Sequence, residues 1–144
     1  MNYSTDNTRI IDKVDLVTPN DVISKYPLTD EISKLVYGTR NEVSQILHGK
    51  DDRLIAVVGP CSIHDPDSAE EYAKLLIDEK KKYEEDILLI MRVYFEKPRT
   101  SIGWKGLIND PDMDNTFDAN KGLFLARSIL CLLYTSDAAD EVVS

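Results

Sequence analysis

The sequence has few of the features that mark several large classes of protein. It contains two cysteines in 144 residues, and Cys61 and Cys131 are too isolated to form a disulfide framework or a C-x-x-C zinc pattern. No apolar run approaches the roughly 18 residues that cross a bilayer. The sequence MNYSTDNTRIIDK at the N-terminus lacks the basic start and the apolar core of a secretory signal. We therefore expect a cytoplasmic protein that does not enter a membrane.

Positive charge is also scarce. The chain has 17 Lys and Arg residues against 26 Asp and Glu residues, which gives a formal net charge of -9. A general nucleic-acid binder or a binder of anionic membranes would present a positive surface to its partner, so this charge argues against both. A hydrophobic content of 42% with 30% charged residues is typical of one ordinary globular domain.

The first 50 residues have the pattern of a helical extension. Residues 1–17 are polar with scattered aliphatic side chains, which is typical of an arm that becomes ordered only by docking. The sequence TPND at 18–21 resembles a helix start, and Thr29 begins a second helix that ends at Gly49. Apolar residues recur in the second helix at helical spacing: Ile32, Leu35, Val36, Val43, Ile46 and Leu47.

The next segment has the pattern of a parallel βαβ unit. Leu54 to Val58 is a continuous apolar run, as expected for a strand covered on both faces. Ser68, with Glu71 three positions later, resembles a capping box and predicts the start of a helix. Ile87 to Met91 then predicts a second buried strand. Two strands joined by a helix at this spacing form a right-handed parallel crossover.

Residues with ligand-binding chemistry follow both predicted strands. Cys61 lies in VVGPCSIHDPDS after the first strand, and Arg92 ends the second. Parallel strands end at the same edge of a sheet, where ligands bind in α/β folds and barrels, so we expect the two residues to be neighbours. From the residues alone, Cys61 could also be a small buried hydrophobic residue. Arg92 is harder to explain without a partner, because an unpaired charge at the end of an apolar strand is costly.

A long polar loop, residues 94–116, follows the second strand, and loops of this length in compact domains are usually functional. Residues 92–105, at the end of the strand and the start of this loop, carry a local charge of +3, from Arg92, Lys97, Arg99 and Lys105 against Glu96. Because Pro98 disfavours helix, Lys97 and Arg99 alternate in an extended segment and can point to one side, with Thr100 beside them. These side chains could bind phosphate and carboxylate groups, or they could form a solvated face.

Other polar and aromatic residues of this region have simpler interpretations. His64 could join Cys61 at a metal, but a surface position is the more ordinary outcome for it. Trp104 is expected to anchor the loop rather than to stack on a ligand. Three spaced acids lack the full Ca²⁺-loop pattern and are expected in turns: Asp110, Asp112 and Asp114. A third helix is expected from about Phe117.

Three stretches of the chain resemble one enzyme family. DDRLIAVVGPCSIHDPDSAEEYA, LIMRVYFEKPRTSIGWKGLINDP and MDNTFDANKGLFLARSIL are similar to the 3-deoxy-D-arabino-heptulosonate 7-phosphate (DAHP) synthases, specifically the class I microbial type regulated by aromatic amino acids. The resemblance runs to about Leu130, over long and nearly gapless segments. It implies an α/β fold, the N-terminal part of a (β/α)8 TIM barrel with an N-terminal helical extension, truncated.

The resemblance also implies an activity and its residues. DAHP synthases are transferases that condense phosphoenolpyruvate with erythrose 4-phosphate, release phosphate, begin the shikimate pathway and require a divalent metal ion such as Mn, Fe, Co or Zn. By resemblance, Cys61 is a metal ligand, Arg92 and Lys97 bind phosphoenolpyruvate, and Lys97 is also catalytic. The segment that contacts erythrose 4-phosphate is Lys97, Pro98, Arg99 and Thr100. The alternative is an inactive truncated fragment that acts at most as an association module.

The same resemblance divides the chain into three parts. Residues 1–50 would be an extension that forms homo-oligomer contacts and part of a feedback site, where Asp6 can meet the amino group of an aromatic amino acid. Residues 51–130 would form the first βα units, with the substrate loop at 94–116. Residues 131–144, CLLYTSDAADEVVS, depart from the family and are expected to be a non-family tail, so Cys131 carries no functional weight. A complete barrel needs about 250 residues, so the remaining metal and phosphate ligands would lie outside this chain.

Overall fold

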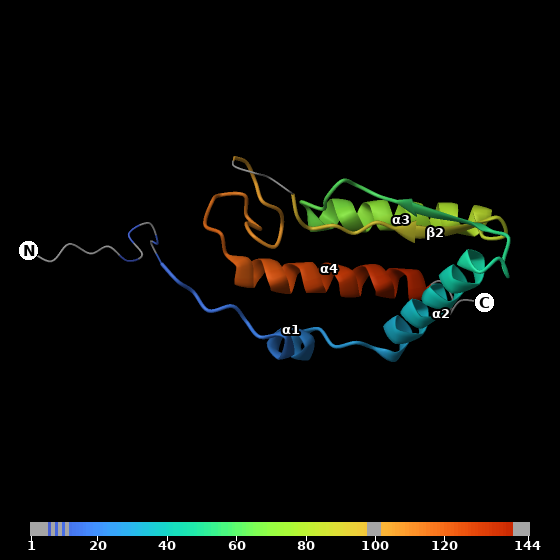
Figure 1. Cartoon of the computed structure of the whole chain (residues 1–144), viewed down its shortest axis with the longest axis horizontal. Coiled ribbons are helices and arrows are strands. Elements are labelled where there is room, and N and C mark those ends of the chain that lie inside the picture. The colour runs from blue at the N-terminus through green and yellow to red at the C-terminus, as the bar shows by residue number, and fades with distance from the viewer. Residues whose placement is uncertain (1–5, 7, 9, 11, 98–101, 140–144) are drawn as a thin grey trace, which may run out of the picture.

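The computed structural model describes residues 6, 8, 10, 12–97 and 102–139, with side chains described as far as residue 134. Four helices and two strands occur in this part, in the order α1, α2, β1, α3, β2, α4. Their bounds are α1 Pro19–Lys25, α2 Asp30–Leu47, β1 Leu54–Val58, α3 Pro66–Tyr83, β2 Ile87–Met91 and α4 Ala119–Ala139. Helix α3 lies against the sheet, α4 runs beside α3, and α1 lies on the other side of α4 (Figure 1).

The two strands form a parallel pair, which confirms the predicted βαβ unit and both strand boundaries. The register runs from Leu54 opposite Ile87 to Val58 opposite Met91. The expected cover on both faces of β1 is wrong for the described part of the chain, because Leu54 is 71% exposed and Val57 is 59% exposed. The cause is that α3 packs mainly on β2, whose Leu88 is 5% exposed, and that these two strands alone do not close a barrel.

Helix α3 begins three residues before the start predicted from Ser68. The N-cap is Asp65, whose side chain accepts a hydrogen bond from the backbone N–H of Ser68 at 3.0 Å, and Pro66 occupies the first helical position. The Ser68 hydroxyl also donates to the same carboxylate oxygen, at 2.5 Å. Both bonds lower the pKa of Asp65, and the bond from the Ser68 hydroxyl has the larger effect. The serine therefore supports the cap and does not form it.

The helical extension begins at the caps that the sequence predicts. Thr18 forms a capping box with Asp21 at the start of α1, and Thr29 caps α2 by accepting from the N–H of Ile32. Helix α2 stops just before Gly49, which takes a left-handed conformation with φ of 66°. Both predicted helices are therefore confirmed.

The residues around α1 dock on α4. The side chain of Asn120 accepts from the N–H of Val17 at 2.8 Å and donates to the carbonyl of Asp15 at 3.0 Å. Farther along α4, the ammonium of Lys25 lies 4.6 Å from the centre of the Phe124 ring. The part of the extension from residue 15 onward is thus ordered by docking, as expected.

Helix α4 begins two residues after Phe117, which has a left-handed φ of 55°. The helix continues to Ala139, so the residues expected as a non-family tail extend it past Leu130. No helix within the described ranges combines the length and apolar character needed to cross a membrane.

A hydrophobic cluster lies where the loops that follow the two strands meet helices α3 and α4. Its buried members are Ile63, Ala69, Leu107 and Ile129. Leu107 is completely buried. The cluster joins the loop after β1, the loop after β2, and helices α3 and α4. The two loops that carry the candidate site residues are therefore anchored in a common core.

Candidate active site at the strand ends

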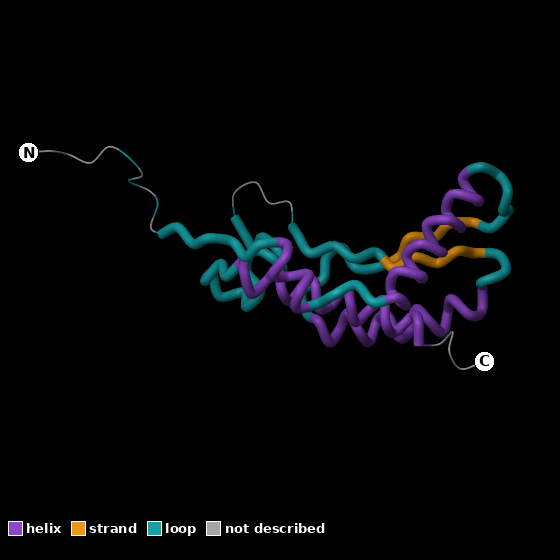
Figure 2. Tube along the Cα trace, turned by 90° about the horizontal axis from the view of Figure 1, so that it is seen from below, coloured by secondary structure: helices purple, strands orange, loops and turns teal. Residues whose placement is uncertain are grey.

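The loops after β1 and β2 leave the sheet on the same side (Figure 2). The N–H of Arg92 donates to the carbonyl of Val58 at 2.6 Å, which extends the strand pairing by one bond. Its guanidinium Nη1 donates to the carbonyls of Pro60 at 2.6 Å and Cys61 at 2.5 Å. The predicted proximity of Arg92 and Cys61 is confirmed. Arg92 has five side-chain N–H donors, and these bonds use only those of Nη1.

Gly59 permits this close approach. A Cβ atom at this position would lie 2.6 Å from the carbonyl oxygen of Arg92 and 3.0 Å from its Cβ. No side chain fits there without moving the backbone that follows one of the strands. A contact with a residue 33 positions away leaves no local signal, so this role of Gly59 could not be predicted from the sequence.

Cys61 is exposed, so it is not the buried hydrophobic residue that its type alone allowed. The two residues after it are buried, with Ser62 at 7% and Ile63 at 2% exposure. The N–H of Ile63 donates to the carbonyl of Tyr94 at 2.8 Å and ties this loop to the segment after β2. The thiol is therefore presented to the surface from a backbone that is anchored just beyond it.

Lys97 lies in a short hairpin within the predicted substrate loop. Its N–H donates to the carbonyl of Lys105 at 2.9 Å, and Glu96 forms an antiparallel bridge with Gly106. A Cβ on Gly106 would collide with the carbonyl of Phe95. The hairpin thus brings two of the predicted cationic residues, Lys97 and Lys105, into adjacent segments. Three other predicted residues lie outside the described part of the chain: Pro98, Arg99 and Thr100.

Trp104 anchors the hairpin, as predicted. Its indole N–H donates to the carbonyl of Asp110 at 2.6 Å, and its ring packs against the hydrophobic cluster. Asp110 itself is more than a surface turn residue, because it is only 3% exposed. The prediction of acids in turns fits the two exposed acids of this loop, Asp112 and Asp114, better than it fits Asp110. Asp112 pairs with Lys121 at 2.6 Å, and hydrogen bonds from Thr116 lower the pKa of Asp114.

The described residues do not by themselves form a metal centre. No three His, Cys, Asp or Glu side chains in the described ranges gather closely enough to hold an ion. His64 is exposed in the loop beyond Cys61, as expected for a surface residue. An exposed thiol at a strand end can supply one ligand, whereas metal sites in enzymes use about three protein ligands or more. Asp6 is exposed in the N-terminal arm, far along the chain from these residues.

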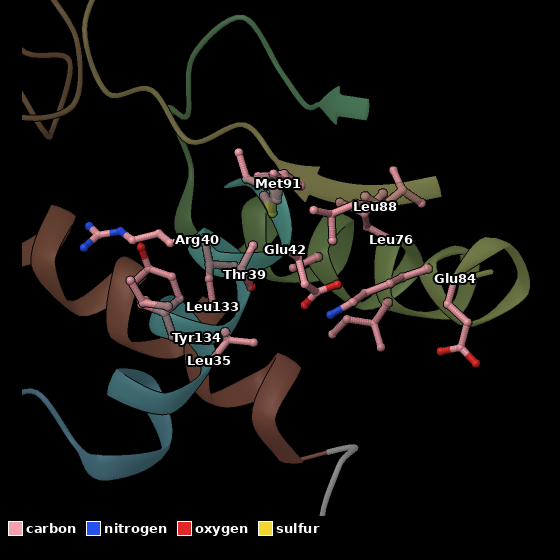
Figure 3. A pocket seen from close by; sticks show the side chains of 18 of the residues that line it. Leu35, Thr39, Arg40, Glu42, Leu76, Glu84, Leu88, Met91, Leu133 and Tyr134 are labelled. Atoms are coloured by element: carbon pink, nitrogen blue, oxygen red, sulfur yellow. The ribbon is translucent and has the colours of Figure 1, made fainter. Parts of the chain in front are cut away.

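A separate groove of about 860 Å³ runs along β2, between that strand and helices α2, α3 and α4 (Figure 3). Much of its lining is apolar, and each of the four elements contributes: Leu35, Leu76, Leu88, Met91 and Leu133. None of the described candidate residues lines this groove, although Met91 and Val93, on either side of Arg92, do. The groove is therefore distinct from the strand-end site.

Comparisons with known proteins agree with these features. Residues 25–143 match the sequence model of the family described as "DAHP synthetase I family". The match includes most of residues 131–144, whose assignment as a tail outside the family stays a prediction.

Individual relatives give the same result. The chain is 48% identical over 130 residues to the Phe-sensitive phospho-2-dehydro-3-deoxyheptonate aldolase of Escherichia coli (strain K12), covering 90% of this chain and 37% of the relative. It is 52% identical over 128 residues to the phospho-2-dehydro-3-deoxyheptonate aldolase of Haemophilus influenzae, covering 88% and 35%.

A solved structure is also similar. It is that of the phospho-2-dehydro-3-deoxyheptonate aldolase from Francisella tularensis SCHU S4, which matches with a TM-score of 0.85 at 52% identity, over 89% of this chain and 38% of that chain. The chain spans a little more than a third of the length of these three relatives. The matched residues include the ends of both strands and the hairpin that lies between β2 and α4. The chain therefore belongs to the DAHP synthetase I family.

Proposed function

We propose that this chain contributes the first βα units of a (β/α)8 barrel enzyme, a 3-deoxy-7-phosphoheptulonate synthase. The reaction joins phosphoenolpyruvate to erythrose 4-phosphate and releases inorganic phosphate. The observation that carries the proposal is the contact between Arg92 and the Cys61 loop at the strand ends, in a chain of this family. Because the chain spans only a little more than a third of its relatives, the activity is proposed for the whole protein.

Arg92 and Lys97 would bind phosphoenolpyruvate. The substrate carries a phosphate and a carboxylate, and a planar guanidinium can donate two parallel hydrogen bonds to either group. Since Nη1 of Arg92 is held by two backbone carbonyls, the orientation of the guanidinium is set before the substrate arrives. Lys97 would add a compact positive charge that stabilises the charge on the phosphate as it leaves.

Erythrose 4-phosphate would be contacted by Lys97, Pro98, Arg99 and Thr100. Both substrates are anions, while the protein as a whole is acidic, with a net charge of -9. A cationic segment at the rim of the strand ends would therefore concentrate the substrates locally. The alternating positions of Lys97 and Arg99 around Pro98 would direct both cations to one side.

The proposed enzyme would use a divalent ion, either Mn, Fe, Co or Zn, with Cys61 as one ligand and the others outside this chain. A site that mixes one thiolate with nitrogen and oxygen ligands suits several of these ions. A reducing cytoplasm would keep the exposed thiol available.

Residues 1–50 would contribute to homo-oligomer contacts and to feedback by an aromatic amino acid. The docking of α1 on α4 shows that part of this segment adheres to the rest of the chain. The E. coli relative is named as Phe-sensitive, which supports regulation of this kind in the family. Asp6 would accept the amino group of the inhibitor.

A chimera provides the test. The aligned 130-residue segment of this chain would replace its counterpart in the E. coli relative, and phosphate release would be measured with both substrates present. We expect the chimera to be active, and Lys97→Met to lower the rate about 100-fold. Lys74→Met is the matched control, since Lys74 is an exposed cation on α3 that pairs with Glu70. A folded chimera without activity, or equal rates for the two variants, would contradict the proposal.

A further inference from the structure

Asp110 lies buried where the hairpin of Lys97 meets the segment that leads into α4. Its carboxylate oxygen Oδ2 accepts a hydrogen bond from the N–H of Asn115 at 3.3 Å. The other oxygen, Oδ1, is buried and has no hydrogen-bond partner within the described part of the chain. An ordinary turn does not require a buried carboxylate, so this position calls for a specific reason.

The backbone of Asp110 is as fully engaged as its side chain. Its carbonyl accepts from the indole of Trp104 at 2.6 Å and from the N–H of Met113 at 3.3 Å, and its own N–H donates to the carbonyl of Gly106 at 3.0 Å. Two of these contacts reach back into the hairpin, and one reaches forward. Asp110 therefore connects the hairpin with the segment that follows it.

Trp104 and Gly106, which Asp110 contacts, lie on either side of Lys105 in the sequence. The carbonyl of Lys105 accepts the N–H of Lys97, and this bond holds the backbone of Lys97 in the hairpin. Asp110 thus holds Trp104 and Gly106, and Lys105 between them binds the backbone of Lys97. We propose that Asp110 is a positioning residue for Lys97, an inference whose catalytic meaning rests on the proposed function.

The side chain of Asp110 is needed because the following segment is held in an unfavourable conformation. Met113, Asn115 and Phe117 all have left-handed backbones, with φ of 57°, 64° and 55°. Bulky residues such as Met113 and Phe117 keep this conformation only when their surroundings enforce it, whereas asparagine adopts it more readily. The bond from the N–H of Asn115 to Oδ2 supplies such a constraint, and it needs an acceptor but no charge. Asparagine can replace that acceptor, whereas alanine cannot.

Amide hydrogen exchange of the full chain tests this role without any ligand. We expect Asp110→Ala to make the amides of Lys97 and Leu107 exchange about tenfold faster while the amides of β1 and β2 keep their rates. Asp110→Asn should stay close to the wild type. Asp112→Ala is the matched control, because Asp112 belongs to the same loop but is exposed and pairs with Lys121 on α4.

Three results would overturn the inference. First, the amides of Lys97 and Leu107 could keep their wild-type exchange rates in Asp110→Ala. Second, all amides of Asp110→Ala could exchange equally faster, which would indicate general destabilisation. Third, the amides of Asp110→Asn could exchange as fast as those of Asp110→Ala. Titration of the chimera with phosphoenolpyruvate separates this question from the proposed function, because the E. coli relative supplies the rest of the barrel. If the chimera shows no response at Arg92 or Lys97, that result counts against the substrate assignment, while the exchange rates of the full chain still decide the role of Asp110.

Discussion

Arg92 donates from Nη1 to the backbone carbonyl of Cys61 at 2.5 Å, and this bond joins the two strand ends of the candidate site. The same nitrogen reaches the carbonyl of Pro60 at 2.6 Å. A cation at the end of an apolar strand is thereby satisfied by backbone oxygens. The loop that presents the thiol and the residue proposed to bind substrate thus form one unit.

Gly59→Ala should destabilise the chain by about 2 kcal/mol, because the new Cβ would displace the backbone of Arg92. Denaturant unfolding measures this difference. Gly38→Ala is the matched control, since Gly38 lies in α2 with nothing within 4 Å of its added Cβ. We expect the control to gain about 0.5–1 kcal/mol from higher helix propensity. Equal stability of the two variants would show that the approach of the strand ends does not depend on Gly59.

Leu107→Ala should cost about 3 kcal/mol, because Leu107 is fully buried in the cluster behind the site. It should also loosen the hairpin of Lys97, whose return segment Leu107 anchors through its N–H to Phe95. Leu54→Ala makes the same chemical change at a side chain that is 71% exposed, and it should change the free energy of unfolding by less than about 1 kcal/mol. Similar losses in both variants would contradict the assigned position of the core.

The cap of α3 should make stability depend on acid pH. Hydrogen bonds from Ser68 lower the pKa of Asp65 in the folded chain, so the ionised carboxylate stabilises the fold above its unfolded pKa of about 4. This contribution should be lost as the pH falls through the lower, folded pKa. Asp65→Asn keeps a capping oxygen but does not titrate.

The two proteins can be compared by denaturant unfolding between about pH 6 and about pH 2.5. The difference between the wild type and Asp65→Asn should be present at the upper end and shrink toward the lower end. A constant difference over the whole range would mean that the ionisation of Asp65 is not coupled to folding.

The purified chain of 144 residues should release no phosphate from phosphoenolpyruvate and erythrose 4-phosphate. The described residues offer Cys61 but no cluster able to hold a metal ion, and the chain spans a little more than a third of its relatives. A phosphate assay with added Mn²⁺ checks this, with the intact E. coli relative as the positive control. Turnover by the purified chain would show that the site is more complete than we infer.

Local patterns predicted the elements of the fold well. Continuous apolar runs located both strands, and Thr18 and Thr29 located two helix starts, because these signals depend on neighbouring residues. The start of α3 was predicted too late because Ser68 and Asp65 both fit a cap, and only the folded geometry shows which one accepts the bond. The exposure of β1 could not be predicted, because it depends on what packs against the sheet.

The site was predictable in its position but not in its supporting contacts. The rule that parallel strands end at one edge placed Cys61 beside Arg92. By contrast, the contact of Gly59 with Arg92 and the burial of Asp110 depend on backbone geometry that residue types do not encode. Asp110 resembles any turn acid in the sequence, and an alternating pattern of acids gives no sign that one of them is buried.

The most direct test concerns the substrate role of Arg92. In the chimera with the E. coli relative, Arg92→Lys keeps the charge but cannot donate to two carbonyls and an anion from one planar fork. We predict that kcat/KM for phosphoenolpyruvate falls about 100-fold while the unfolding midpoint changes little. If Arg92→Lys keeps kcat/KM within about twofold of the unsubstituted chimera, the strand-end site does not bind this substrate as proposed.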